Sequence, residues 1–197
     1  MLAIAYYDDI KYSIGVKMLF YKERKEIISN GRKICFSGHR PNKLLWGYDE
    51  NATSCERFKI FMYEKLEYAI LKGYTYFISG MALGIDMICA EIVLNLKKKY
   101  PYIVLECAIP CLNQSQCWTY ASKKRYKKIL LKADYVNFIS KNRYSKSCML
   151  NRNLYMVQNC DIVIAVWNGT KSGTANTINL AKKHGKKVII VSPNNFN

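Results

Sequence analysis

Apolar residues recur along the chain in short dense runs, and longer stretches with a helical period separate these runs. Runs of this kind, bounded by polar or turn residues, are typical of strands that are buried on both faces. The runs predict strands at 33–37, 74–79, 102–110, 134–140, 161–167 and 186–192. The periodic stretches between them predict helices at 55–72, 84–98, 115–132, 148–159 and 174–184.

Strands that alternate with helices predict a parallel sheet with helices on both faces. The fold class is therefore α/β, a doubly wound and mainly parallel sheet, formed by a single domain over residues 33–197. Gly73 follows the first predicted helix and is expected to end it, because glycine favours the position just after a helix. Residues 1–32 mix charged and apolar positions without a clear sheet role, and we interpret them as an N-terminal extension.

Charge adds an expectation about the kind of partner. The formal net charge is +17, and residues 121–152 hold ten Lys or Arg against one acid, Asp134. A field of this sign attracts nucleic acid, nucleotides or an acidic partner. A solvated lysine face is the alternative interpretation.

The remaining composition limits the cellular compartment of the protein and the kinds of metal and cysteine chemistry that we expect. No apolar run approaches the ~18 residues that span a bilayer, and acidic residues come too early for a signal peptide, so we expect a cytoplasmic protein without a membrane partner. The eight cysteines form no CxxC pair and only two histidines are present, so no metal site is expected. Buried, reduced thiols are expected at Cys35, Cys89, Cys107 and Cys160.

Three glycine-bearing segments follow the first, second and fifth predicted strands. Ligands of doubly wound folds bind beyond the carboxyl ends of the strands, so we expect these segments to meet at one edge of the sheet. The alternative is that turns between strands and helices simply favour glycine and serine. The candidate binding residues are Ser37, Gly38, His39, Arg40, Ser79, Gly80, Met81, Gly84, Asp86, Asn168, Gly169, Thr170, Ser172, Gly173 and Thr174.

The residue types in these segments favour an anionic guest. Glycine lets a ligand approach backbone N–H groups, and the following helix adds a partial positive charge at its N-terminus. Arg40 and Arg152 are candidates to clamp a phosphate bidentately. No standard nucleotide fingerprint is present, so the residues alone indicate a phosphate-bearing or other anionic small ligand and imply no cofactor.

Four single residues have two interpretations each. Asp86 either complements a helix dipole or accepts a hydrogen bond from a ribose or a loop amide. His39 is either a turn residue or a ligand contact. Arg152 is either solvated or placed near the carboxyl edge of the sheet, where it would contact a ligand. We favour ligand contact for both residues. Trp118 either stacks on a base or covers the core.

Four motifs together resemble a known family. The segments "ICFSGHRPNKLLWGYDE", "FISGMALGIDMICAEIVL", "AIPCLNQSQCW" and "DIVIAVWNGTKSGTANTI" look like the YpsA-type branch of the SLOG superfamily, over roughly residues 33–193. The resemblance implies a Rossmann-like fold and the binding of nucleotides, nucleotide-derived signals or, in the DprA branch, single-stranded DNA. It also implies a homo-oligomer.

The chain is also similar to the LOG phosphoribohydrolases, with one departure. Met149, Arg152, Asn153 and Met156 match the first LOG motif in part, and Gly173-Thr174 matches the second. The catalytic glutamate of that family would fall at Thr177, which cannot act as a general base, and Glu91 is a speculative substitute. Binding a nucleotide-derived small molecule, to sense or sequester it, is therefore the first hypothesis. Nucleotide N-glycosidase activity and DprA-like single-stranded nucleic-acid binding are the alternatives.

Overall fold

The structure is a computed structural model that describes residues 18–20 and 31–197. Within these residues one sheet of seven strands has the order β1-β5-β4-β3-β2-β6-β7, and every neighbouring pair is parallel. The strands are β1 (Met18–Phe20), β2 (Arg32–Gly38), β3 (Tyr74–Ser79), β4 (Val104–Ile109), β5 (Tyr135–Phe138), β6 (Ile162–Val166) and β7 (Lys187–Val191).

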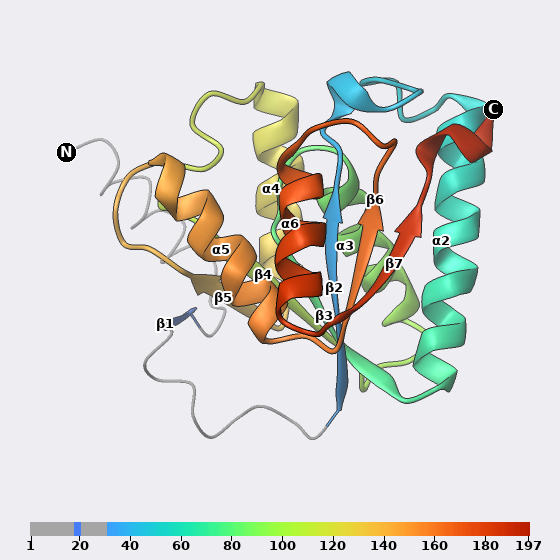
Figure 1. Ribbon diagram of the computed structural model, residues 1–197, viewed down its shortest axis with the longest axis horizontal. Helices are drawn as coiled ribbons and strands as arrows, with labels where there is room; N and C mark the ends of the chain where they lie inside the picture. Colours follow the sequence, from blue (N-terminus) through green and yellow to red (C-terminus); the bar gives the residue numbers. More distant parts are fainter. Residues whose placement is uncertain (1–17, 21–30) are drawn as a thin grey trace.

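Helices cover both faces of this sheet and make a three-layer Rossmann-like fold. They are α2 (Thr53–Leu71), α3 (Ile85–Leu96), α4 (Tyr120–Lys132), α5 (Lys146–Gln158) and α6 (Gly173–Lys183), with short 3-10 helices η2 (Pro41–Lys43) and η3 (Pro193–Phe196). The larger core lies between the sheet and α2, α3 and α4, and the smaller core lies under α5 and α6. Figure 1 shows α6 in front of the central strands and α3 behind them.

The predicted α/β class is confirmed, and all six predicted strands are present. Gly73 ends α2 as expected, with a φ of 84° that a side chain would disfavour. The third predicted helix is wrong at its start, because α4 begins at Tyr120 instead of residue 115. The hydroxyl of Thr119 accepts a hydrogen bond from the backbone N–H of Ser122 and caps α4, which leaves the preceding residues in turns.

One strand of the predicted N-terminal extension belongs to the sheet. Met18–Phe20 forms β1, which pairs in parallel with β5 at one edge. The pattern of the extension assigned it no clear sheet role, and this short segment has one. The rest of the extension, residues 1–17 and 21–30, lies outside the described residues.

The strand order reverses at β2, which pairs with β3 on one side and with β6 on the other. Such a reversal leaves a crevice beyond the carboxyl ends of the two diverging strands. The backbone N–H of His39, just after β2, donates to the carbonyl of Val166 at the end of β6 (3.2 Å). The fold therefore places the first and third predicted loops side by side.

The cysteines behave as the sequence predicts. Cys35, Cys89, Cys107 and Cys160 are free and buried, and Cys117 is exposed. None of the helices between residues 31 and 197 has the length and hydropathy needed to cross a bilayer.

Candidate functional site

A cavity of about 320 Å³ lies at the carboxyl edge of the sheet, between the end of β2, the start of α6 and helix α5. Residues from all three predicted loops line this carboxyl-edge cavity, together with side chains of α5. Nine candidates from the sequence lie in its wall: Ser37, Gly38, His39, Arg40, Asp86, Arg152, Ser172, Gly173 and Thr174. The fold thus brings together residues up to 137 positions apart in the chain, from Ser37 to Thr174.

The other eight candidates lie outside the wall of the cavity. They are Ser79, Gly80, Met81, Gly84, Trp118, Asn168, Gly169 and Thr170. Most of them belong to the same loops but are engaged within the protein. Trp118 packs edge-on against Tyr126, with ring centroids 5.3 Å apart, and contributes to the larger core.

The position of the Arg152 side chain requires a glycine at position 80. A Cβ atom at position 80 would lie 1.7 Å from Nη1 of Arg152 and 2.9 Å from a carboxylate oxygen of Asp86. Nη1 donates a hydrogen bond to the carbonyl oxygen of Gly80, and Nε donates to Oδ1 of Asn153 (2.8 Å). Two of the three guanidinium nitrogens therefore already donate within the protein, and the expected bidentate contact of Arg152 with a phosphate stays a prediction.

Gly38 and Gly84 also make room for neighbouring protein atoms. A Cβ atom at Gly38 would lie 2.4 Å from Cβ of Ile85, and one at Gly84 would lie 2.7 Å from the carbonyl oxygen of His39. Gly84 also has a φ of 91°, in the region that glycine favours. On the side where a Cβ would lie, the atoms that approach these glycines belong to α3, α5 and the first loop, and contact of the glycines with a ligand stays a prediction.

The second loop is closed by its own hydrogen bonds. The hydroxyl of Ser79 donates to the carbonyl of Asp86 (2.8 Å) and accepts from the N–H of Met81 (3.1 Å), whose φ is 55°. Ala82 N–H donates to the Asp86 carboxylate (3.3 Å). Gln114, which follows β4, donates to the carbonyl of Met81 (3.0 Å). This loop is therefore a scaffold for the cavity, and only two of its residues reach the wall.

Asp86 and Arg152 form a buried pair of opposite charges, with Nη1 and Oδ2 3.7 Å apart. Burial raises the pKa of the Asp86 carboxyl, and the nearby Arg152 charge opposes that rise. Burial likewise lowers the pKa of Arg152, and Asp86 opposes that change. Each group compensates the desolvation of the other, so removing either one leaves an unpaired buried charge.

His39 joins the first loop to the third. Its Nε2 lies 2.6 Å from Oδ1 of Asn168, and the same Oδ1 accepts from the N–H and the hydroxyl of Thr170. The ammonium of Lys43 donates to the carbonyl of Lys171 (2.9 Å) across the same gap. Burial lowers the pKa of His39 from its ordinary value of 6.5, against the Asn168 hydrogen bond, which raises it.

Two helices begin at the cavity, and only one of them has an open N-terminus. The backbone N–H of Ile85 at the start of α3 donates to the carbonyl of His39 (3.4 Å), and Asp86 follows in the same turn. At α6 the Ser172 hydroxyl caps the N–H of Ala175. The amides of Gly173 and Thr174 have no intrahelical partner in this first turn. No atom lies within 4 Å of a Cβ built on Gly173, so space is available there.

Several wall residues were not predicted as binding residues. They are Phe36, Asn42, Lys43, Ala82, Met149, Asn153 and Met156. Their spacing offered a signal, because Met149, Asn153 and Met156 share a helical face with Arg152. Asn42 and Lys43 follow the first loop directly, so extending that loop by three residues would have included them.

The residues considered for hydrolysis are engaged elsewhere. The Thr177 hydroxyl is buried and donates to the carbonyl of Gly173 (3.0 Å). Glu91 pairs with Arg125, with one oxygen 2.6 Å from Nη2, and it lines a different groove. The speculation that Glu91 substitutes for the missing LOG glutamate is therefore not supported by its position.

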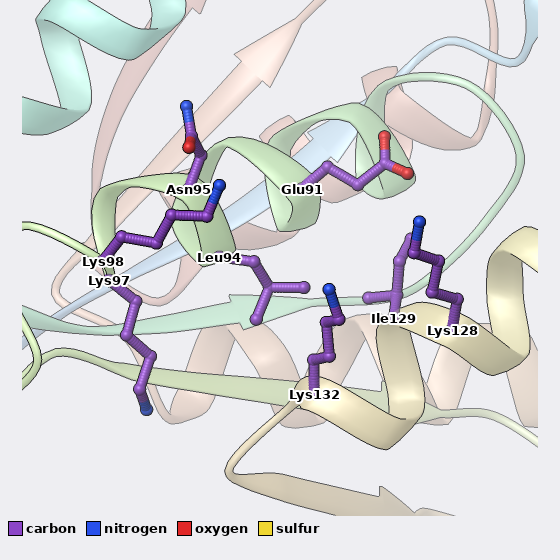
Figure 2. Close-up of a pocket in the computed structure, with 8 residues that line it drawn as sticks. All are labelled: Glu91, Leu94, Asn95, Lys97, Lys98, Lys128, Ile129 and Lys132. Atoms are coloured by element: carbon purple, nitrogen blue, oxygen red, sulfur yellow. The ribbon is translucent and has the colours of Figure 1, made fainter.

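That different groove lies between α3 and α4 and has a volume of about 480 Å³. Figure 2 shows the lining residues of this α3–α4 groove: Glu91, Leu94, Asn95, Lys97, Lys98, Lys128, Ile129 and Lys132. Its two acidic neighbours are already paired, Glu91 with Arg125 and Asp134 with Lys97. Within the described residues, Lys98, Lys128 and Lys132 have no carboxylate within 4 Å, so the groove is a basic surface.

A known protein family matches most of the described chain, including the loops of the cavity. The YpsA family model, described as the YspA SLOG family, matches residues 34–192. The chain belongs to this YpsA family of SLOG proteins. All three loops of the cavity fall within the matched range, so the site is part of the shared domain.

Relatives of this YpsA-family chain include bacterial and prophage proteins. It is 35% identical over 130 residues to the SPbeta prophage-derived protein YoqJ of Bacillus subtilis, a match covering 60% of this chain and 76% of that one. It is 34% identical over 116 residues to a UPF0398 protein of Halalkalibacterium halodurans, covering 58% of this chain and 61% of that relative. The second match thus spans less than two thirds of the relative's length.

Solved structures show the same fold in DNA processing protein A. The protein from Helicobacter pylori, described for its single-stranded DNA binding mode, superposes with a TM-score of 0.57 at 20% identity. The protein from Streptococcus pneumoniae superposes with a TM-score of 0.56 at 19% identity. Each match covers 81% of this YpsA-family chain, and 65% and 50% of the respective neighbour.

Replacing Gly80 with alanine tests the packing of the second loop. The new methyl group displaces Arg152, which leaves Asp86 buried without its cation, so we expect the free energy of unfolding to fall by about 1–3 kcal/mol. Gly173→Ala is the matched control, because its Cβ meets open space; we expect its stability to be unchanged or raised by less than about 1 kcal/mol. Urea denaturation measures both variants, and equal stabilities would contradict the packing described here.

The lowered pKa of His39 predicts a pH dependence of stability. At a pH between the lowered pKa of folded His39 and its unfolded pKa of about 6.5, the imidazole is protonated in the unfolded chain and neutral in the folded one. The free energy of unfolding therefore falls as the pH drops below about 6.5. The slope is at most about 1.4 kcal/mol per pH unit for one proton. We expect His39→Gln to flatten this part of the urea-denaturation pH profile, and the exposed His184→Gln to leave it steep. Identical slopes in the two variants would show that His39 is not the group responsible.

Proposed function

We propose that this chain binds a small, phosphate-bearing, nucleotide-derived ligand in the carboxyl-edge cavity, to sense or to sequester it. The observation that carries the proposal is the open N-terminus of α6 in the wall of a cavity that also contains the exposed Arg40. Helix N-termini bind anions through free amides and the helix dipole. The phosphate is therefore assigned to the amides of Gly173 and Thr174.

The charge balance around the cavity supports an anionic guest. Arg40, Lys43 and Arg152 line it, against one described carboxylate, that of Asp86. Because Asp86 is paired with Arg152, the cations left for a ligand are Arg40 and Lys43. Ser37 adds a half-buried hydroxyl that has no described hydrogen bond within the protein.

The size and lining of the cavity favour one nucleotide unit. A volume of about 320 Å³ is near the lower end of the range of about 300–1,000 Å³ for small-molecule pockets. Met149 and Met156 provide an apolar and adaptable wall against which a sugar or a base can pack.

Binding is supported better than hydrolysis of an N-glycosidic bond. Hydrolysis of that kind needs a positioned general acid or base. The one described carboxylate in the wall, Asp86, accepts from Ala82 and pairs with Arg152, and Thr177 replaces the LOG glutamate. The described wall thus holds no unpaired carboxylate to act as a general acid or base, and the imidazole of His39 is engaged through Nε2 with Asn168.

The proposal predicts that Arg40 contributes directly to affinity. We expect isothermal titration to detect binding of AMP, GMP or ADP-ribose, and Arg40→Gln to weaken it by about 10- to 100-fold, the size of a charge-assisted hydrogen bond. Arg143→Gln, which removes an exposed arginine outside the cavity, is the matched control and should bind like the wild type. Failure of all three ligands to bind, or equal losses in both variants, would contradict the proposal.

Single-stranded nucleic-acid binding is the second candidate, and the α3–α4 groove is the observation that favours it. The groove presents lysines without described carboxylate partners on α4 and just after the end of α3 (Figure 2). Lysines of this kind neutralise backbone phosphates and release counterions. The Helicobacter neighbour of the same fold is described as a single-stranded DNA binder, which agrees with this candidate.

Charge reversal in the α3–α4 groove tests the second candidate. Lys128→Glu/Lys132→Glu should abolish the retardation of an oligo-dT probe in gels, or reduce its affinity at least tenfold, and should flatten its salt dependence. Lys124→Glu/Lys127→Glu changes the net charge equally on exposed positions of α4 outside the groove and should have a smaller effect. Absent or salt-insensitive binding by the wild type, or equal effects of both pairs, would contradict a groove-specific site.

Three further points remain predictions under this proposal. Two are expectations from the sequence, a homo-oligomeric state and a cytoplasmic location, and the third is a role in a phage or mobile-element context, where the chain would act as a sponge for a defence signal. The prophage origin of the relative YoqJ is consistent with the last of these. Sedimentation of the purified chain and mass spectrometry of its co-purified ligand address the first and the third.

A further inference from the structure

One face of the sheet is incompletely covered next to its β7 edge. The strand register places Ile34, Ile162, Ile189 and Val191 on the face that α2 also covers. Over β2–β5 this face is packed by α2, α3 and α4. Over β6 and β7 the described chain supplies only the short η3, whereas parallel sheets are normally covered on both faces.

A groove of about 800 Å³ results, bounded by α2, β7 and η3. We refer to it as the β7 groove. Its floor is apolar, with Ile162 and Ile164 from β6, and its sides include Phe61 from α2 and Ile189 from β7. Ile189 is 40% exposed, although Ile164 and Val191 on the same sheet face are buried. An apolar surface of this kind on a folded chain marks an interaction site.

The rim of the β7 groove is basic. Arg32, Lys65, Lys72 and Lys187 line it, and none of its described lining residues is acidic. Within the described residues none of these four cations has a carboxylate within 4 Å. The guanidinium of Arg32 lies over the ring of Tyr74, 4.0 Å from its centroid. An apolar floor between cations that lack a described carboxylate partner is complementary to an apolar stripe flanked by carboxylates.

We propose that the β7 groove binds an acidic amphipathic helix of a partner protein. A helix laid there would extend the layer of α2, α3 and α4 over the uncovered strands, with its apolar stripe on the isoleucines and its Glu or Asp side chains at the rim cations. Helices dock in apolar grooves in this way through residues spaced i, i+3, i+4 and i+7. A second copy of this chain is a poorer occupant. The basic rim of its own β7 groove and its net charge of +17 would repel the first copy.

The β7 groove is separate from the carboxyl-edge cavity. Arg32, Ile162 and Lys187 are the first residues of β2, β6 and β7, so the groove reaches the amino ends of these strands. The cavity lies beyond the opposite ends, and the two sites share no lining residue. Partner binding in the groove therefore does not depend on the proposed nucleotide site.

A designed peptide tests this proposal on the full chain. The probe is a fluorescein-labelled helix of about 16 residues with Leu at i, i+3, i+4, i+7 and i+11 and Glu at most other positions. We expect fluorescence anisotropy to show saturable binding. Ile189→Asp and Lys65→Glu/Lys72→Glu should each weaken this binding at least tenfold.

Matched controls separate the groove from general attraction to a basic protein. Leu131→Asp alters a leucine that is 43% exposed on α4, outside the groove, and Lys124→Glu/Lys127→Glu repeats the charge change on α4; both should bind the peptide like the wild type. Absent binding, equal binding of a peptide with the same composition in scrambled order, or equal losses in the controls would overturn the proposal. So would a wild-type dimer that Ile189→Asp converts to a monomer, because a second copy would then occupy the groove.

Discussion

The buried guanidinium of Arg152 is the contact on which the carboxyl edge depends. It crosses from α5 to the second loop, donates to the carbonyl of Gly80 and pairs with the Asp86 carboxylate at 3.7 Å. This placement requires a residue without a side chain at position 80. Because each charge compensates the desolvation of the other, α5, the second loop and the start of α3 are held as one unit.

This constraint divides the edge of the sheet into a closed part and an open part. The closed part contains the second loop and the N-terminus of α3, whose donors are used by Ser79, Asp86 and the carbonyl of His39. The open part contains Arg40 and the first turn of α6. The second loop is thus the scaffold, and the third loop offers the free amides. For a nucleotide-derived ligand, the phosphate would lie on the α6 side of the cavity.

Much of this arrangement was predictable from the chain alone, because it follows from local patterns. The dense apolar run at 161–167 identified β6, and Gly73 marked the end of α2. The partners across the edge were not predictable, since His39 and Asn168 are 129 positions apart and meet only when β2 pairs with β6. Glycine at position 80 signalled a close approach, but the sequence did not distinguish a ligand from Arg152. Trp118 was ambiguous for the same reason, and its contact with Tyr126 places it in the core.

The central claim is that a phosphate-bearing ligand binds at the open N-terminus of α6. Titration of the ¹⁵N-labelled chain with a nucleoside monophosphate, followed by amide chemical shifts, locates the ligand residue by residue. We expect the largest shifts at Gly38–Arg40 and at Gly173–Ala175, with small changes in the second loop around Gly80. Shifts that are absent, or that concentrate in the α3–α4 groove or the β7 groove, would contradict the claim.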